Sequence, residues 1–287
     1  MRKLKEFIIE KLILLCGIAS IFFVVLIFLF LLREGIAVFK IVSPFKFLLG
    51  KSWYPISEPP QLGILPLILG SFLITVGAAI ISIPIGVGCA IYIAEIAPLK
   101  IKEILKAGIE LLAAIPSVVL GFIGMVTLVP LVKNVFHLPT GLTALSGSIM
   151  LAFMAMPTIV SIAEDALYSV PKTYKEGALA LGATQWQTIW RVMLPAASSG
   201  ILAAIMLGIG RVIGETMAVM MITGNAAVIP NSILAPVRTL TATIAAEMGE
   251  AVVGSEHYFA LFAIGIVLFV ISFAINVTAD LFLHKGQ

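Results

Sequence analysis

Residues 169–195 read SVPKTYKEGALALGATQWQTIWRVMLP, a polar insert in an otherwise very apolar chain. Pro171 suits the first turn of a helix, and Gly182 suits a break because glycine tolerates positive φ. Thr184 suits the N-cap of a second helix, which carries apolar residues at spacings of three and four. The insert therefore predicts two short helices in a loop between membrane spans. We expect this loop to bind a partner protein.

The composition on either side of this insert is that of a polytopic membrane protein. The chain has 287 residues, of which 61% are hydrophobic and 11% are charged, and its mean hydropathy is +1.15. A helix that crosses a hydrocarbon core of about 30 Å needs about 20 apolar residues. Six regions qualify: residues 12–32, 62–94, 111–131, 141–163, 196–222 and 258–279. We therefore predict an all-α polytopic membrane protein with six transmembrane helices.

Two parts follow from this pattern. Residues 1–61 hold a basic N-terminus, the first transmembrane helix and an outer loop, and residues 62–287 form the transmembrane core with the loop at about 169–195. The first apolar run ends at Arg33 rather than at a small-residue cleavage site, so we expect an uncleaved helix rather than a signal peptide. Trp53 and Tyr54 in the outer loop suit the headgroup level of a membrane.

The distribution of Lys and Arg predicts the orientation, because these residues are retained on the cytoplasmic side. With the N-terminus inside, eleven of them lie on the inner segments and six on the outer ones. The inner set is Arg2, Lys3, Lys5, Lys11, Lys100, Lys102, Lys106, Lys172, Lys175, Arg191 and Lys285. We therefore expect both termini, and the insert, to lie in the cytoplasm.

The span over residues 196–222 carries two charges, Arg211 and Glu215, four residues apart and so on one face of a helix. A charge at mid-bilayer costs about 3 kcal/mol on insertion scales and usually faces protein or a water-filled path. An arginine matches an oxyanion bidentately, so a translocated anion is its natural guest, with Glu215 holding the guanidinium in place. The alternative is a buried ion pair with a purely structural role.

Residues 236–250 are too polar to cross the membrane and predict a short interfacial or re-entrant helix. Arg238 at its start is a candidate contact for an entering anion, and a solvated capping role is the alternative. Glu247 and Glu250 lack a neighbouring His or Asp cluster, so no metal site is predicted. No catalytic residues are predicted either.

The chain lacks an ATPase motif of its own. Gly50-Lys51-Ser52 imitates the end of a phosphate-binding P-loop, but the required first glycine is Phe45. The sequence therefore predicts a protein that is not an enzyme and binds no cofactor, with ATP and Mg²⁺ held by a separate ATPase.

The insert resembles the EAA loop of ABC importer permeases. The matching positions are Glu176, Gly177 and Ala178, then Gly182, Ile189, Leu194 and Pro195, with Gly177 where the family more often has Ala. In that family the loop forms a coupling helix that docks into a groove of the ATPase. An amphipathic helix lying on the inner leaflet is the alternative.

Further motifs resemble the PstC permease family of phosphate-specific ABC importers over nearly the whole chain. They are residues 63–71 (GILPLILGS), 116–121 (PSVVLG), 210–219 (GRVIGETMAV), 224–225 (GN) and 238–241 (RTLT). The resemblance implies a type I importer permease (MetI-like) fold, and it places Arg211 and Glu215 on a charged pair associated with phosphate translocation.

The resemblance also implies the partners: a PstA-like second permease, a PstB-like ATPase dimer and a PstS-like extracytoplasmic phosphate-binding protein. The location implied is the prokaryotic cell membrane, with lipid around the spans and no nucleic-acid partner. Two alternatives remain, an ABC permease for molybdate or sulfate and an anion transporter or channel that needs no ATPase.

Overall fold

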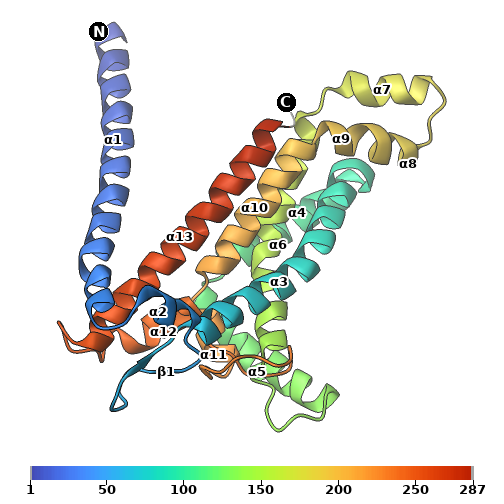
Figure 1. Cartoon of the computed structure of the whole chain (residues 1–287). Coiled ribbons are helices and arrows are strands. Elements are labelled where there is room, and N and C mark those ends of the chain that lie inside the picture. Colours follow the sequence, from blue (N-terminus) through green and yellow to red (C-terminus); the bar gives the residue numbers. More distant parts are fainter. Residues whose placement is uncertain (1, 286–287) are drawn as a thin grey trace.

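The computed structural model describes the backbone of residues 2–285 and the side chains of residue 7 and residues 9–278. The side chains of Arg2, Lys3, Lys5 and Lys285, which entered the charge comparison, lie outside this set. The long helices are α1 (Arg2–Gly35), α3 (Leu65–Ile91), α4 (Leu99–Ala114), α5 (Ser117–Val135), α6 (Ala144–Ser169), α10 (Ser198–Gly214) and α13 (Glu256–Lys285). Figure 1 shows them as an elongated bundle with short elements at both ends.

The short helices are α2 (Pro44–Leu49), α7 (Lys172–Ala180), α8 (Gln185–Thr188), α9 (Leu194–Ala196), α11 (Met217–Ile222), α12 (Leu240–Glu247), the 3₁₀ helix η1 (Ile36–Lys40) and the π-helices η2 (Tyr92–Ile96) and η3 (Ile189–Met193). Strands β1 (Trp53–Tyr54) and β2 (Gln61–Leu62) form an antiparallel hairpin with Trp53 opposite Leu62. We call the end of the bundle that carries α7 and α8 the α7 end, and the end that carries α12 and the hairpin the α12 end (Figure 1).

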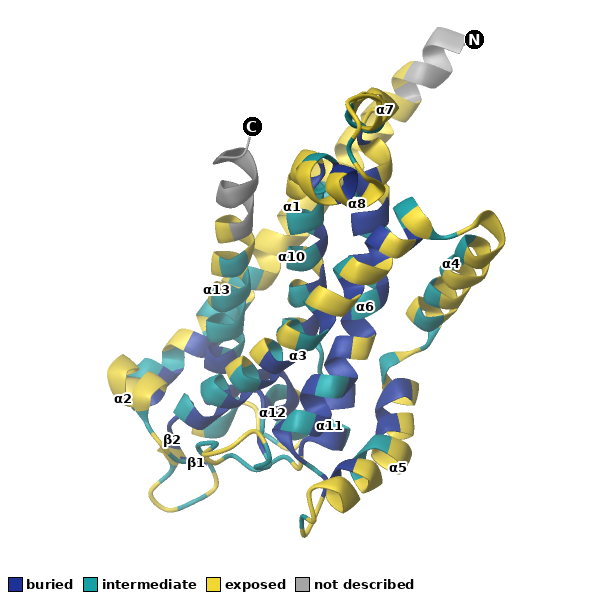
Figure 2. Ribbon diagram, turned by 90° about the vertical axis from the view of Figure 1, so that its right-hand side faces the viewer, coloured by how far each residue is buried: buried dark blue, intermediate teal, exposed yellow. Residues whose placement is uncertain are grey.

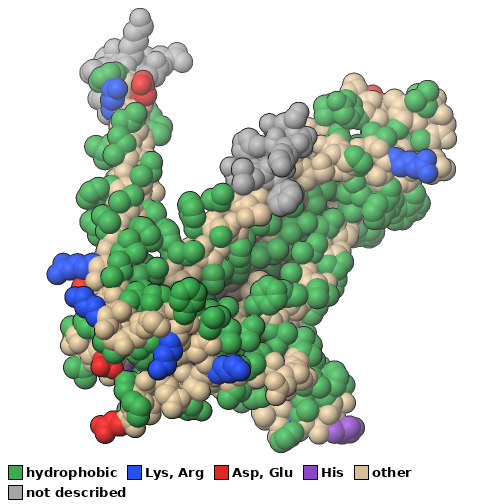
Figure 3. All heavy atoms as spheres, viewed as in Figure 1, with side chains coloured by type: hydrophobic (Ala, Val, Ile, Leu, Met, Phe, Trp, Pro, Cys, Tyr) green, Lys and Arg blue, Asp and Glu red, His purple; other side chains and the backbone are tan. Residues whose placement is uncertain are grey.

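The predicted membrane spans agree with the helices. Five segments are long and apolar enough to cross a membrane: Ile9–Lys40, Leu65–Ile96, Ser117–Val135, Ala144–Ser169 and Glu256–Thr278. A sixth candidate is the pair Gln185–Ala196 and Ser198–Gly214, which is bent by 72°. Hydrophobic side chains cover the visible flanks of the bundle, whereas charged ones gather toward its ends (Figure 3).

Two of the predicted spans are interrupted by residues outside the helical conformation. The first, over residues 111–131, breaks at Ile115 and Pro116, which both have extended backbone angles. A residue before proline is driven out of the helical region by the proline ring. The helix of the third span therefore begins at Ser117. The second interruption lies at Glu215, between α10 and α11.

Close packing of α3, α6 and α10 forms the centre of the bundle. Ile159 on α6 is fully buried, between Gly86 of α3 and Gly208 of α10. A Cβ atom added at Gly86 would lie 2.8 Å from Ile159 Cγ2, and one added at Gly208 would lie 2.5 Å from Ile159 Cγ1. Both contacts are tighter than a side chain permits, so glycine at these positions lets the three helices approach each other.

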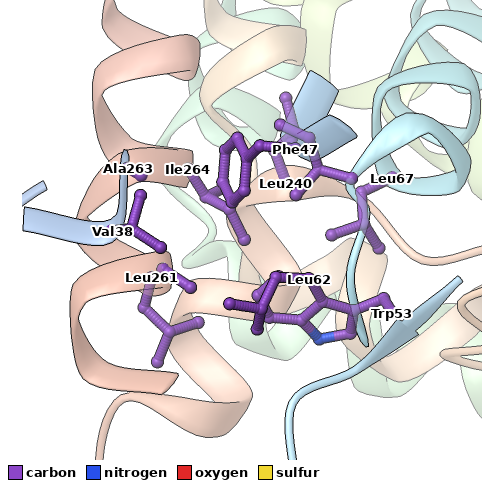
Figure 4. Packing of buried hydrophobic residues seen from close by; sticks show 11 residues of the cluster. Val38, Phe47, Trp53, Leu62, Leu67, Leu240, Leu261, Ala263 and Ile264 are labelled. Atoms are coloured by element: carbon purple, nitrogen blue, oxygen red, sulfur yellow. The ribbon is translucent and has the colours of Figure 1, made fainter. Parts of the chain in front are cut away.

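A second core at the α12 end joins the outer loop to the helices. Figure 4 shows Phe47 and Trp53 packed with Leu240 of α12 and with residues of α3 and α13. Trp53 is 2% exposed. Its ring therefore faces the protein core, whereas Tyr54 is 57% exposed, and a place at the headgroup level stays a prediction for both.

Helix α4 lies beside α6, and none of its residues is fully buried (Figure 2). The Nζ atoms of Lys102 and Lys106 lie 4.0 and 3.5 Å from Oε1 of Glu164, a buried carboxylate on α6. The apolar residues Leu99 and Ile104 of α4 are each 71% exposed. Two lysines of α4 therefore face α6, whereas these two apolar side chains are left uncovered.

Candidate functional site

The α7–α8 unit has the form that the sequence predicts. Helix α7 ends at Ala180, Gly182 follows with φ of +83°, and Thr184 caps α8 in a reciprocal capping box with Gln187. The capping box satisfies backbone N–H groups at the start of α8, and positive φ is a conformation that glycine adopts freely.

One face of this unit packs against the helix bundle, and the opposite face is exposed. Ile189 and Met193 are buried against Ile91 of α3 and Leu167 of α6. The most exposed apolar side chains of the unit are Leu181 (91% exposed), Trp186 (60%) and Trp190 (61%). Exposed apolar side chains next to charged ones are typical of a surface that meets a partner or a lipid headgroup layer.

The predicted coupling residues lie on or beside this unit. Glu176 and Gly177 are exposed on α7, Ala178 is half-buried, Gly182 forms the turn and Pro195 is exposed in α9. A Cβ atom added at Gly177 would meet nothing within 4 Å, so the departure from alanine there changes no contact within the chain.

Two hydrogen bonds tie the unit to the end of α3. Lys175 Nζ lies 2.5 Å from Oε2 of Glu95, and Gln185 Nε2 donates to the Glu95 backbone carbonyl at 3.2 Å. Glu95 lies in the π-helix η2, a form often found at functional positions within helices. Both α7 and α8 therefore contact the same residue of the bundle.

The predicted pairing of Arg211 with Glu215 was wrong. Arg211 Nη1 donates to Thr158 Oγ1 at 3.4 Å. Oε1 of Glu215 instead accepts from the backbone N–H groups of Thr216 and Ala218, at 3.1 and 3.3 Å. The reason is that α10 ends at Gly214 and Glu215 is extended, with φ −68° and ψ 132°. The carboxylate caps α11 rather than continuing the face of α10.

Arg211 lies on an uncovered stripe of α10. Leu207, Gly210, Arg211 and Gly214 are all exposed, and a Cβ atom added at Gly210 or Gly214 would meet nothing within 4 Å. Because an arginine facing hydrocarbon is costly, the stripe suits contact with water or another protein rather than lipid. Gly208 behaves differently, since it packs against Ile159.

Arg238 lies in a polar cluster at the α12 end. Its Nη1 atom is in an ion pair with Oε1 of Glu247. Oε2 of Glu247 also accepts from the Trp53 indole Nε1 at 3.1 Å and lies 2.9 Å from His257 Nε2. The predicted short helix is α12, capped by Thr239, whose hydroxyl accepts from Ala242 N–H.

A cavity of about 630 Å³ adjoins this cluster. Trp53, Arg238, Glu247, Glu250, Asn225 and His257 are among its lining residues. Its volume is in the range of sites for small ligands, about 300–1,000 Å³.

Hydroxyl groups connect the cluster to the membrane-embedded charges. Thr239 Oγ1 and Thr241 Oγ1 lie 3.0 Å apart, and Thr241 Oγ1 donates to the Glu215 backbone carbonyl at 2.9 Å. Of the residues singled out from the sequence, Glu215 is linked to α12 through this backbone contact, Arg238 pairs with Glu247 and Arg211 contacts Thr158, so none of the three contacts another through its side chain among the described residues.

Several members of these sites have no local signal in the sequence. Trp53 and Glu247 are 194 residues apart, and Lys175 and Glu95 are 80 apart. His257 carries no local motif. Only the tertiary fold brings such distant positions together.

Comparisons with known proteins identify the family. Residues 82–285 match the family model described as "Binding-protein-dependent transport system inner membrane component". The Bacillus subtilis protein "Probable ABC transporter permease protein YqgH" is 42% identical over 274 residues, which are 95% of this chain and 89% of that one. The Mesorhizobium japonicum "Phosphate transport system permease protein PstC" is 37% identical over 260 residues, 84% of this chain and 79% of that one.

Solved structures share the fold at low sequence identity. A chain of the MetNI methionine ABC transporter, in an inward-facing conformation, has a TM-score of 0.63 at 18% identity, covering 81% of this chain and 100% of that one. A chain of a bacterial alginate ABC transporter has a TM-score of 0.64 at 16% identity, with 94% and 93% covered. The expected MetI-like permease fold is therefore confirmed. From its fold, its family match and its relatives, this multi-pass membrane chain belongs to the inner membrane components of binding-protein-dependent transport systems.

Proposed function

We propose that this chain is the transmembrane permease subunit of an ATP-driven phosphate importer, which forms the translocation path and couples to a separate ATPase. The observation that carries the proposal is the anchored but exposed α7–α8 unit, in a chain whose relatives include phosphate transport permeases. The aligned residues are 84% of this chain and 79% and 81% of two of those relatives, so the likeness extends over most of each permease.

The α7 end faces the cytoplasm in this proposal. The excess of Lys and Arg on the predicted inner segments supports that orientation. The N-terminal end of α1 and the C-terminal end of α13 both lie toward the α7 end (Figure 1), so one orientation of the bundle satisfies the charge rule for both termini.

The exposed side of the α7–α8 unit docks onto the ATPase, which binds ATP and Mg²⁺. Leu181 and the two exposed tryptophans are the apolar anchors, with Glu176 beside them on α7. Closure of an ATPase dimer then moves the unit as a rigid piece, and the contacts to Glu95 transmit that movement to α3.

The uncovered stripe of α10 faces a second, PstA-like permease across the translocation path. Arg211 contributes a fixed positive charge to this path, and an oxyanion passing it gains charge-assisted hydrogen bonds. A PstS-like binding protein delivers phosphate at the α12 end.

The test is ATP-dependent uptake of radiolabelled phosphate into vesicles that hold this chain with its three partner types. We expect uptake by the wild type and its loss in Arg211→Gln, with assembly unchanged. Arg33→Gln is the control, because that side chain is 82% exposed on α1. Uptake of molybdate or sulfate but not of phosphate contradicts the substrate, and uptake without ATPase contradicts the importer class.

A further inference from the structure

The polar cluster around Glu247 brings together hydrogen-bond donors from separate parts of the chain. The indole of Trp53 comes from strand β1, the guanidinium of Arg238 precedes α12, and the imidazole of His257 lies in the first turn of α13. All three contact the carboxylate of Glu247. Convergence of cationic and N–H donors on one point is the arrangement by which proteins bind oxyanions.

The group that these donors contact is the carboxylate of Glu247, a side chain of the protein itself. Glu247 is half-buried, with its side chain 17% exposed, and the cavity of about 630 Å³ opens beside it. Arg238 is 20% exposed, and its Nε atom has no hydrogen-bond partner among the described residues. The Nε atom is buried, and the charge of the guanidinium is balanced within the chain by Glu247.

The position suits entry to the path. The cavity lies at the α12 end, and the buried hydroxyl of Thr241, three residues after Arg238, contacts the backbone carbonyl of Glu215.

We propose that this cavity is an entry site for a tetrahedral oxyanion. In the proposal the carboxylate of Glu247 pairs with Arg238 when the site is empty, and the entering oxyanion replaces Glu247 as the partner of Arg238. The inference rests on the proposed function, since it names a waiting position for the same substrate. In the absence of substrate the internal carboxylate keeps the site near neutral, and this weakens retention of an anion that must move onward.

The test measures binding rather than transport. Inorganic phosphate is titrated into the purified permease–ATPase complex without the binding protein, and binding is followed by ³¹P NMR line broadening. Glu247→Gln keeps an oxygen that accepts from Trp53 but removes the competing charge. We expect it to bind phosphate about tenfold more tightly than the wild type.

Glu250→Gln is the matched control. Glu250 lines the same cavity and is exposed, so its replacement removes one negative charge without freeing Arg238. Equal tightening in both variants means general electrostatics and overturns the proposal, as does unchanged binding in Glu247→Gln.

The double variant Glu247→Gln with Arg238→Met returns binding to the wild-type level or below if Arg238 is the ligand. Retention of the tight binding in that variant overturns the role of Arg238. Assembly with the ATPase, checked by gel filtration, shows that each variant is folded. The binding titration does not depend on phosphate uptake. If Glu247→Gln leaves phosphate binding unchanged while the transporter still takes up phosphate, the entry site is contradicted and the proposed function is not.

Discussion

Lys175 of α7 and Glu95 of η2 form an ion pair, Nζ to Oε2 2.5 Å, that joins the exposed α7–α8 unit to the end of a membrane-spanning helix. The carboxylate is 7% exposed and the lysine side chain 36%. The pair is thus more shielded than a surface salt bridge, whose contribution is about 0–1 kcal/mol.

Breaking this pair is expected to uncouple ATP hydrolysis from transport. Glu95→Gln and Lys175→Met each remove one charge, so α7 keeps its docking face but loses its fixed orientation to α3. We expect the ratio of phosphate imported to ATP hydrolysed to fall several-fold, measured in proteoliposomes. The reversed pair Glu95→Lys with Lys175→Glu is expected to restore part of the ratio. An unchanged ratio in the single variants contradicts the coupling role.

A charge at Leu181 is expected to prevent docking. The side chain is 91% exposed, so Leu181→Glu leaves the fold intact while placing a carboxylate in the apolar contact with the ATPase. We expect loss of ATPase from the affinity-purified complex. Val253→Glu, 79% exposed near α12, is the control that keeps the ATPase bound. Equal recovery of ATPase with both variants argues against docking through this surface.

The two roles of Glu215 are expected to separate on substitution. Glu215→Gln keeps a side-chain oxygen that accepts from Thr216 and Ala218, whereas Glu215→Ala removes the cap at a cost of about 1 kcal/mol. Thermal unfolding in detergent is expected to be near wild type for the glutamine variant and lower for alanine. If the charge also serves translocation, phosphate uptake falls in both, and normal uptake by Glu215→Gln assigns the residue to capping alone.

Two glycines on α10 are expected to respond oppositely to alanine. Gly208→Ala places a methyl group 2.5 Å from Ile159 and destabilises the isolated chain by about 1–3 kcal/mol. Gly210→Ala meets open space and stabilises the helix by about 1 kcal/mol. The measurement is thermal unfolding of the purified chain without partners. A loss of stability in Gly210→Ala that occurs only in the assembled complex identifies this stripe as a subunit contact.

The sequence was sufficient for the spans and for the α7–α8 unit because both depend on local patterns. Charge-free runs mark the helices, and Gly182 and Thr184 act within a few residues of themselves. The break at Glu215 was not predictable in this way, because RVIGETM has an apolar helical pattern and only the capping contacts of the carboxylate end α10. The cluster around Glu247 depends on tertiary contacts between β1, α12 and α13, which leave no periodic signal.

The contact of helix α4 with the bundle is a second feature that the sequence alone does not predict. Its lysines contact Glu164 inside the bundle, whereas composition alone marks it as too charged to be part of a span. A hydropathy scan averages over both faces of a helix and so misses charges that are neutralised from within.

The placement of Ile159 between two glycines has a mechanical consequence. A side chain held by backbone on two sides leaves α3, α6 and α10 no room to slide past one another, so these helices are expected to move as a single block. The 72° corner near Ala197 and the extended residue Glu215 lie at the two ends of α10, where its helix is already interrupted. We therefore expect α10 to change its orientation by bending at these two positions rather than by sliding along α6.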